Sequence, residues 1–201
     1  MDKMGKIYYL MGKSSSGKDT IYKRLMADTS LGLKNIVLYT TRPIRQGERD
    51  GMEYYFVDEK RLDEFLAAKK VIELRAYNTC FGVWKYFTVD DETVDLSHHS
   101  YLMIGTIESF VKTKEYYGSD HVVPLMIELD DGIRLQRALD REKGQDQPKY
   151  SEMCRRYLAD EADFSAEKKA EAGITREFIN EDLEQCLAEL SDFIRREAAS
   201  V

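Results

Sequence analysis

The sequence predicts an α/β fold in which a mostly parallel sheet carries helices on both faces. Short apolar runs rich in β-forming residues alternate with amphipathic stretches along the whole 201-residue chain. Two of the runs, 101–104 and 122–129, are almost continuously apolar, which is typical of parallel strands buried on both faces. No repeat or linker divides the chain, so we expect a single domain over residues 1–201. In such a sheet, ligands bind at the carboxyl ends of the strands.

The first half of the chain predicts a strand, a loop and a helix, followed by a small αβ flap. An apolar run at Ile7–Met11 ends at a glycine, and a helical pattern begins at Ile21. A second strand is expected at Ile36–Thr40, and the polar stretch 42–51 is rich in glycine, proline and charge, which indicates a loop. The flap then comprises an extended segment at Tyr54–Val57, a helix over Glu59–Lys69 capped by Asp58, and strands at Val71–Tyr77 and Val83–Val89.

The second half continues the alternation and contains one polar interruption. Helices are expected at about 107–117 and 131–142, each after one of the two apolar strands. The stretch Glu142–Lys149 is polar and contains a glycine and a proline, so it predicts a mobile hairpin or lid before a helix near 150–170. The chain closes with a strand at Glu177–Asn180 and a helix from Asp182 to about Glu197, which gives a core at about 1–40 and 100–201, a flap at about 41–95 and a lid at about 142–160.

The charge of the chain disfavours two classes of partner. There are 30 lysines and arginines against 37 acidic residues, which gives a formal net charge of −7. Nucleic acids and anionic membranes both require a surplus of basic residues, and no segment approaches the roughly 18 apolar residues of a membrane span. The three cysteines are far apart and the amino terminus lacks a long apolar signal core, so we expect a cytoplasmic, reduced protein. The oligomeric state is left open.

Residues 12–18 have the spacing of a phosphate-binding loop, in which a glycine and four further residues precede Gly-Lys. The glycines let backbone amides converge on phosphate oxygens, and the helix that follows points its positive end at them. Lys18 would reach the β- and γ-phosphates of ATP, whereas a turn that only connects strand and helix is the alternative. Asp19 follows this lysine in place of the usual serine or threonine, so either Asp19, through water, or the hydroxyl of Thr20 would meet Mg²⁺. No metal site made by protein ligands alone is expected. The predicted ATP-binding residues here are Gly12, Lys13, Ser14, Ser15, Ser16, Gly17, Lys18, Asp19 and Thr20.

A second candidate phosphate site lies in the polar loop. Arg42 and Arg45 are three residues apart between a proline and a glycine, and Tyr54 follows downstream. Two guanidinium groups at this spacing can clamp one phosphate, because each pairs with its oxygens bidentately, and a tyrosine hydroxyl can add a third contact. The alternative is a solvated charged loop.

Taken together, these two segments resemble guanylate kinases and related nucleoside monophosphate kinases. In that family a phosphate loop opens the chain, and the motif TTRPxRxGExDGxxYxFV builds the flap that binds the acceptor nucleotide. Residues 40–57 of this chain are TTRPIRQGERDGMEYYFV, in which Arg49 occupies one of the variable positions of the motif. Later segments extend the resemblance to residues 5 to about 195. It implies a P-loop NTPase-type fold with a helical lid, ATP with Mg²⁺ as donor and GMP as acceptor.

The resemblance also implies roles for residues outside the two segments. Glu73, in the run Val-Ile-Glu, matches the glutamate that recognises the guanine base. Arg137 and Arg141 repeat an R-x-x-x-R pair before the lid, and Arg156 resembles the arginine of the lid helix. Asn180, in the segment FINEDL, resembles a residue near the adenine. The implied acceptor-binding set is Arg42, Arg45, Tyr54, Glu73, Tyr86 and Thr88; the catalytic set is Lys18, Arg45, Arg141 and Arg156; and Arg137 and Asn180 complete the ATP site.

Departures from the family pattern concentrate where the base would be recognised. Leu38 stands in place of a serine, and Thr106 lies in IGTIES, where the family has D-x-D-x-Q-G. The family's G-N-Y-Y-G-T is represented by a longer segment, in which Tyr86 and Thr88 would take the tyrosine and threonine roles, with Phe81 as the alternative tyrosine equivalent. A pocket that hydrogen-bonds a base discriminates through such groups, so these changes bear on specificity more than on chemistry.

The sequence therefore predicts ATP-dependent phosphorylation of GMP to GDP. One alternative is a kinase of the same architecture that acts on a different nucleoside monophosphate, which Leu38 and Thr106 favour. A second is a non-catalytic binding module of the same fold, which the presence of Lys18 and the lid arginines disfavours. A third is a regulatory nucleotide hydrolase, in which a two-arginine acceptor clamp would have no purpose.

Overall fold

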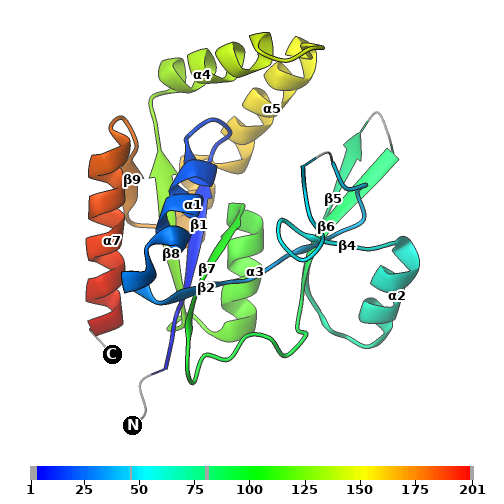
Figure 1. Ribbon diagram of the computed structural model, residues 1–201, viewed down its shortest axis with the longest axis vertical. Coiled ribbons are helices and arrows are strands. Elements are labelled where there is room, and N and C mark those ends of the chain that lie inside the picture. Colours follow the sequence, from blue (N-terminus) through cyan, green and yellow to red (C-terminus); the bar gives the residue numbers. More distant parts are fainter. Residues whose placement is uncertain (1–3, 46, 80–81, 200–201) are drawn as a thin grey trace.

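A five-stranded parallel sheet forms the centre of the protein. The computed structural model describes residues 4–45, 47–79 and 82–199, and Figure 1 shows the central sheet with helices on both sides. Its strand order is β2-β7-β1-β8-β9, and every neighbouring pair is parallel. This confirms the predicted fold class. The strands are β1 (Ile7–Gly12), β2 (Leu33–Asn35), β7 (Ser100–Gly105), β8 (Val122–Glu128) and β9 (Glu177–Ile179).

Side chains of β1 alternate between two apolar clusters, one on each face of the central sheet. Tyr8 and Leu10 pack among residues of α1 (Lys18–Ala27) and α7 (Leu183–Ala199). Tyr9 and Met11 point the other way and pack with residues of α3 (Ile107–Tyr117). All six residues of β1 are buried, as expected for a central parallel strand. Among residues 4–45, 47–79 and 82–199, no helix is both long enough and apolar enough to cross a membrane.

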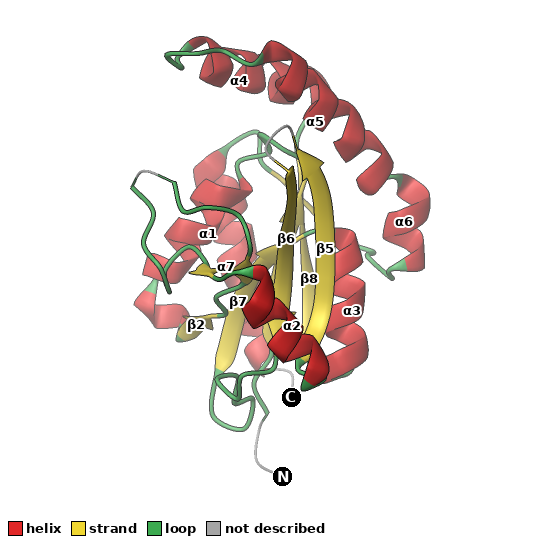
Figure 2. Ribbon diagram, turned by 90° about the vertical axis from the view of Figure 1, so that its right-hand side faces the viewer, coloured by secondary structure: helices red, strands yellow, loops and turns green. Residues whose placement is uncertain are grey.

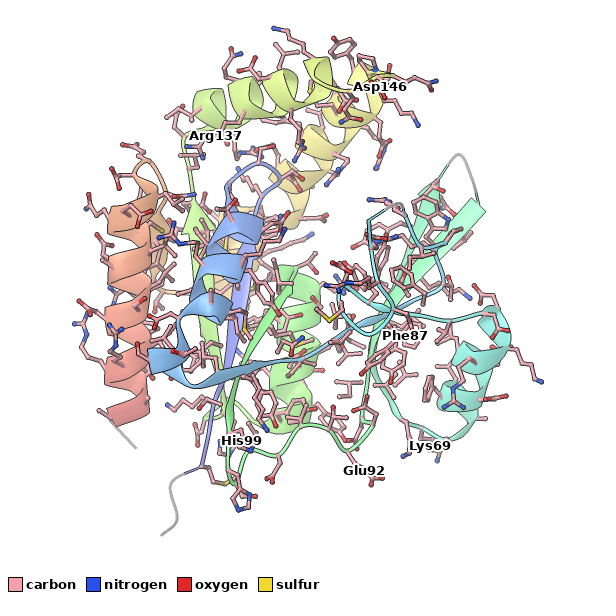
Figure 3. All side chains as sticks on the ribbon, in the orientation of Figure 1. Lys69, Phe87, Glu92, His99, Arg137 and Asp146 are labelled. Atoms are coloured by element: carbon pink, nitrogen blue, oxygen red, sulfur yellow. The ribbon has the colours of Figure 1, made fainter. Side chains whose placement is uncertain are left out.

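A second, four-stranded sheet lies to one side of the first. Its order is β4-β3-β6-β5, from strands β3 (Tyr39–Thr40), β4 (Tyr55–Phe56), β5 (Val71–Thr79) and β6 (Gly82–Val89). Helix α2 (Glu59–Ala67) covers one face, as Figure 2 shows, and Asp58 caps it by accepting a hydrogen bond from the backbone of Arg61. Phe87, labelled in Figure 3, packs there with Tyr39, Leu62 and Phe65. The opposite face is therefore free to carry polar groups toward the central sheet.

A β-bulge in β5 decides which face carries the acidic residue of this strand. Val71 pairs with Val89, but Glu73 pairs with Thr88, so Ile72 is an extra residue relative to β6. Val71 and Val89 belong to the apolar cluster under α2. Without the bulge, Glu73 would point to the same side as Val71, because side chains two apart share a face. Bulges re-aim side chains in this way, and here the bulge turns Glu73 away from the apolar cluster.

Helices α4 (Asp131–Lys143), α5 (Tyr150–Asp163) and α6 (Ala166–Glu171) follow β8 and arch over one end of the molecule (Figure 2). One continuous helix near 150–170 was expected, and that expectation is wrong. The helical backbone stops at Phe164, and Ser165 begins α6 by accepting a hydrogen bond from the backbone of Lys168. Serine competes for backbone groups in this way and favours helix starts over helix interiors.

The predicted strand at Ile36–Thr40 is also wrong in its limits. The chain instead forms β2 at Leu33–Asn35 in the central sheet and β3 at Tyr39–Thr40 in the second sheet. Residues 36–38 connect the two sheets, and Leu38 is buried in the core. The apolar character that suggested a strand thus comes from a buried crossing between sheets.

Candidate active site

The loop after β1 has a backbone shaped to surround a negatively charged group. Gly17 precedes α1 with a φ of 89°, and Ser15 also has a positive φ of 64°. A side chain at Gly17 would run into the amide of Asn180, so glycine is required there both for its backbone and for space. The Asn180 Nδ2 donates to the carbonyl oxygen of Ser16 at 2.7 Å and holds the loop from β9's side. Asn180 thus stabilises the conformation of the loop through this hydrogen bond.

Several polar atoms of this loop have no partner in the described part of the chain. They are the hydroxyl oxygens of Ser15 and Ser16 and the Oδ1 of Asn180, all buried. Buried polar groups are normally hydrogen-bonded, so orphaned ones mark a place where a ligand or water completes the structure. Their position at the carboxyl end of β1 and the start of α1 suits phosphate oxygens.

Lys18 is the first residue of α1, and the side-chain oxygens of the next two residues are exposed beside it. The Lys18 Nζ lies 3.8 Å from Oδ1 of Asp19, whose side chain is 77% exposed. Thr20 is exposed in the same turn. Within the described residues, no three histidine, cysteine or acidic side chains are grouped as they would be around a metal ion. Asp19 and Thr20 therefore fit a Mg²⁺ that brings its other oxygen ligands from water and ATP, which is how Mg²⁺ is usually held.

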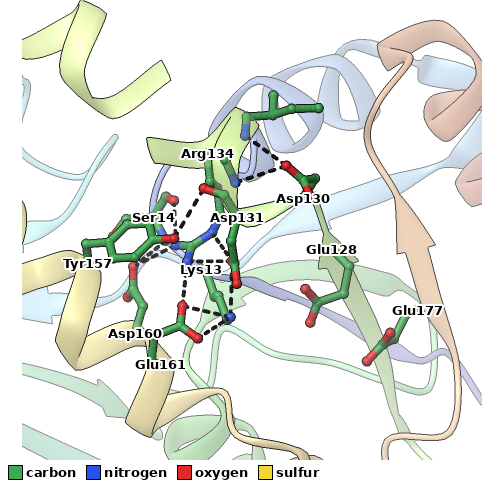
Figure 4. A network of polar contacts seen from close by, with 12 residues as sticks. Lys13, Ser14, Glu128, Asp130, Asp131, Arg134, Tyr157, Asp160, Glu161 and Glu177 are labelled. Carbon is green, nitrogen blue, oxygen red and sulfur yellow. Dashed lines mark hydrogen bonds and ion pairs between the residues drawn. The ribbon is translucent and has the colours of Figure 1, made fainter. Parts of the chain in front are cut away.

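A polar network ties the lid helices to the phosphate loop (Figure 4). The buried Arg134 of α4 pairs with Glu161 at 2.6 Å and lies over the ring of Tyr157. The backbone N–H of Ser14 donates to Oδ2 of Asp160 at 2.7 Å, and Lys13 Nζ donates to Glu161 at 2.9 Å. The carboxylate of Asp160 on α5 thus accepts a hydrogen bond from a loop N–H that would otherwise be free to donate to a phosphate oxygen.

Replacing Asp160 by alanine should strengthen ATP binding about 10–100-fold, because the competing carboxylate is removed and one such charge-assisted hydrogen bond contributes about 1.5–3 kcal/mol. Equilibrium titration of ATP measures the effect. Glu152→Ala on the exposed side of the same helix is the control, since the Glu152 carboxylate accepts from the guanidinium of Arg155 rather than from the loop. Unchanged or weaker ATP binding in Asp160→Ala would show that the carboxylate does not compete.

The three lid arginines are exposed and largely without partners. Arg137 and Arg141 lie on α4, and neither makes a side-chain hydrogen bond or ion pair with another described residue. Arg137 lies near Gly17, at one end of the phosphate loop (Figure 3). Arg156 on α5 approaches the hydroxyl of Ser14 at 3.5 Å. The structure therefore brings Arg137 and Arg156 next to the loop, whereas Arg141 is exposed on α4.

The candidate clamp consists of one buried and one exposed arginine. Arg42 is 4% exposed, and its guanidinium donates to both carboxylate oxygens of Glu48 at 2.6 and 2.7 Å. It also lies over the rings of Tyr54 and Phe56. This guanidinium lowers the pKa of Glu48. Arg45 is exposed, and its backbone N–H donates to Glu48 while its guanidinium lies over the ring of Trp84, 5.9 Å from the ring centre.

The inner face of the second sheet carries a row of polar side chains. Strand pairing sets Glu73 opposite Thr88 and Arg75 opposite Tyr86. Thr88 Oγ1 donates to Glu73 at 2.8 Å, and the ring of Tyr86 contacts that of Tyr54 edge-on. Glu73, Thr88, Tyr86 and Tyr54, which come from three separate segments of the sequence, therefore lie along one surface. Phe81, the alternative to Tyr86, lies outside the described residues.

Tyr54 connects this surface with the arginine clamp, because its ring lies under Arg42 and against Tyr86. Burial raises the pKa of its hydroxyl, and Tyr86 raises it further, whereas the charges of Arg42 and Arg75 lower it. A cavity of about 570 Å³ adjoins the same surface and is lined in part by Arg75, Tyr77, Thr106 and Glu108. Thr106 accepts a hydrogen bond from the backbone of Ser109 and caps α3, so its hydroxyl is engaged within the fold.

Sequence reasoning missed three partners in this site. Arg75 pairs with Glu73, and its position two residues further along a strand was a usable signal, because such residues share a face. Glu48 belongs to the quoted motif but had no assigned role. Asp160 gave no signal, since its contact with Ser14 spans 146 residues of sequence.

Comparison with known proteins places the fold and sequence of this chain among guanylate kinases. The model of the family described as "Guanylate kinase" matches residues 4–94. A guanylate kinase from Symbiobacterium thermophilum is 29% identical over 97% of this chain and 87% of its own length. One from Rhodopseudomonas palustris strain HaA2 is 36% identical, but the match covers 41% of this chain and only 37% of that protein. The crystal structure of a guanylate kinase from Anaplasma phagocytophilum superposes with a TM-score of 0.64 at 23% identity, covering 98% of this chain and 88% of that one, and so shares the fold.

Proposed function

Because this chain belongs to the guanylate kinase family, we propose that it transfers the γ-phosphoryl group of ATP to a nucleoside monophosphate, and that GMP is its acceptor. The observation that carries the proposal is the phosphate loop itself. Its backbone is shaped by Gly17 and Asn180, it contains buried hydroxyls that have no partner among the described residues, and Lys18 begins the helix that follows. Cytoplasmic location and a single domain stay predictions.

On the donor side, the loop and Lys18 would hold the β- and γ-phosphates of ATP. Loop amides and the positive end of α1 attract anionic oxygens, and Lys18 would stabilise charge that develops during transfer. Arg137, beside Gly17, would contact the donor phosphates or the nucleotide near the loop. Asp19 and Thr20 would hold Mg²⁺, which neutralises charge on the phosphates when it is bound with ATP.

On the acceptor side, the second sheet would hold the monophosphate in line with the donor. Arg42 is fixed by Glu48 and lies against Tyr54, so both groups are already positioned before a ligand binds. Arg45 is exposed and would close on the phosphate. Phosphoryl transfer asks the protein mainly for positioning and for positive charge, which this arrangement provides. Arg141 and Arg156 would complete the cage and exclude water when the lid closes.

A coupled assay of ADP release across the common nucleoside monophosphates tests this proposal. GMP-dependent release of ADP is expected, with little release from ATP alone. A kinase that acts on another monophosphate is the second candidate, and the buried Leu38 and the capping role of Thr106 favour it, since neither offers a free polar group to a base. ADP release with no acceptor dependence would instead indicate a hydrolase, and none at all a binding module.

Replacing Arg45 by alanine should raise the KM for GMP about 10–100-fold, because one charge-assisted contact to phosphate contributes about 1.5–3 kcal/mol. The KM for ATP should change little. Steady-state kinetics with each nucleotide varied in turn measures both constants. Arg49→Ala is the matched control, as Arg49 is an exposed arginine of the same loop. An equal rise for both nucleotides would place Arg45 outside the acceptor site.

A further inference from the structure

Glu73 and Arg75 form a buried ion pair on the inner face of the second sheet. The Nε of Arg75 donates to Oε2 of Glu73 at 2.9 Å, and its terminal Nη2 donates to Oε1 at 3.2 Å. Thr88 Oγ1 donates to the same Oε1 at 2.8 Å. The two charged residues are only 5% and 9% exposed. The pair is therefore fixed within the fold, and Arg75 is the member of the pair that lines the neighbouring cavity.

These contacts use most of the hydrogen-bonding capacity of Glu73. An ionised carboxylate offers about four lone-pair positions and cannot donate. Arg75 and Thr88 fill both positions on Oε1 and one on Oε2, so a single position on Oε2 remains. Guanine presents two donors on one edge, the ring N1–H and the 2-amino group. Hypoxanthine presents the N1–H but has no 2-amino group. The capacity left on Glu73 matches one donor.

Arg75 has donors of its own to offer. The guanidinium has five N–H donors and no acceptor atom, so it carries further N–H groups beyond the two that reach Glu73. Arg75 also lines the cavity of about 570 Å³ beside Tyr77 and Thr106. A carbonyl oxygen such as O6 of guanine or hypoxanthine is a natural acceptor for a guanidinium N–H. The 6-amino group of adenine is a donor and would face another donor there.

We propose that Arg75 determines base specificity in the acceptor site, so that the chain binds 6-oxopurine nucleoside monophosphates as a class and distinguishes poorly between GMP and IMP. The inference rests on the proposed function for the location of the acceptor site. Arg75 donates to O6, and the remaining position on Glu73 accepts the N1–H that both bases share. The 2-amino group of guanine finds no free position on Glu73. Arg75 and Thr88 fill three of the four positions, and the N1–H takes the fourth.

Calorimetric titration of GMP and IMP tests this proposal without requiring catalysis. The dissociation constants for wild type should agree within about tenfold. Arg75→Ala frees two positions on Glu73 and should raise the preference for GMP over IMP at least about tenfold. Arg75→Lys keeps the buried charge but loses the bidentate fork, so it should shift the ratio in the same direction. It replaces the alanine variant as the test if that variant does not fold. Arg61→Ala, an exposed arginine on α2, should leave the ratio unchanged.

The outcomes separate this inference from the proposed function. A wild-type preference for GMP over IMP above about tenfold, or no binding of either, overturns the role of Arg75. So does an unchanged ratio in both Arg75 variants. Comparable binding of GMP and IMP with no ADP release would instead support the base preference while contradicting the kinase activity.

Discussion

Replacing Lys18 by alanine is expected to lower kcat about 10²–10³-fold, the loss usual when one preorganised electrostatic contact to a transition state is removed. Lys18 lies at the start of α1, beside a loop whose buried hydroxyls lack partners among the described residues. It makes no hydrogen bond there and approaches only Asp19, at 3.8 Å, so its charge is available to the donor phosphates. The expected loss falls mainly on kcat because the charge to be stabilised builds up during transfer.

The control for this experiment is Lys23→Ala, which removes an exposed lysine from the same helix. Thermal unfolding of both variants should match wild type, since neither lysine contributes to the core. Coupled kinetics at saturating ATP and GMP then compares kcat directly. If Lys18→Ala keeps more than about a tenth of wild-type kcat, the loss is smaller than expected for such a contact. That result would contradict the assignment of this loop to the donor phosphates.

The central sheet was predictable from sequence because its strands are buried on both faces. Val122–Glu128 and Ser100–Gly105 are apolar at nearly every position, and such runs leave few alternatives to a parallel strand. The second strand was misplaced for the opposite reason. Residues 36–38 are apolar because they pack in the core while crossing between sheets, and local pattern cannot distinguish that from a strand.

The candidate site was predictable where one short segment carries the chemistry. The phosphate loop is one short segment, and Arg42 and Arg45 are only three residues apart. Within each segment, the local backbone alone keeps the functional residues close together. The contact of Asp160 with Ser14 depends instead on how α5 packs over the loop. The bulge at Ile72 also has no local signal, yet it determines that Glu73 faces Thr88 rather than α2. Tertiary packing therefore supplies the part of the site that we propose for base recognition.

Glu73→Gln is expected to lower kcat/KM for GMP about 10–100-fold, at about 1.4 kcal/mol per factor of ten, with a smaller effect on AMP. The amide can present a donor where guanine requires an acceptor for its N1–H, whereas adenine has an acceptor at N1. Glu73 also neutralises the buried Arg75, so the variant should be less stable than wild type. Urea unfolding of wild type and variant identifies the conditions under which both proteins are fully folded. The kinetics are then measured under those conditions.

Thr88→Val separates base recognition from this loss of stability. It removes the hydroxyl that donates to Oε1 of Glu73 but leaves the ion pair with Arg75 in place. If Glu73 recognises the base, Thr88→Val should keep a preference for GMP over AMP, while Glu73→Gln should reduce it, because only the second change alters the group that faces N1. Equal losses on GMP and AMP in Glu73→Gln would show that Glu73 supports the fold and does not recognise the base. A wild-type preference for AMP or a pyrimidine nucleotide would likewise remove guanine recognition from this carboxylate and leave the broader kinase activity to be assigned to another acceptor.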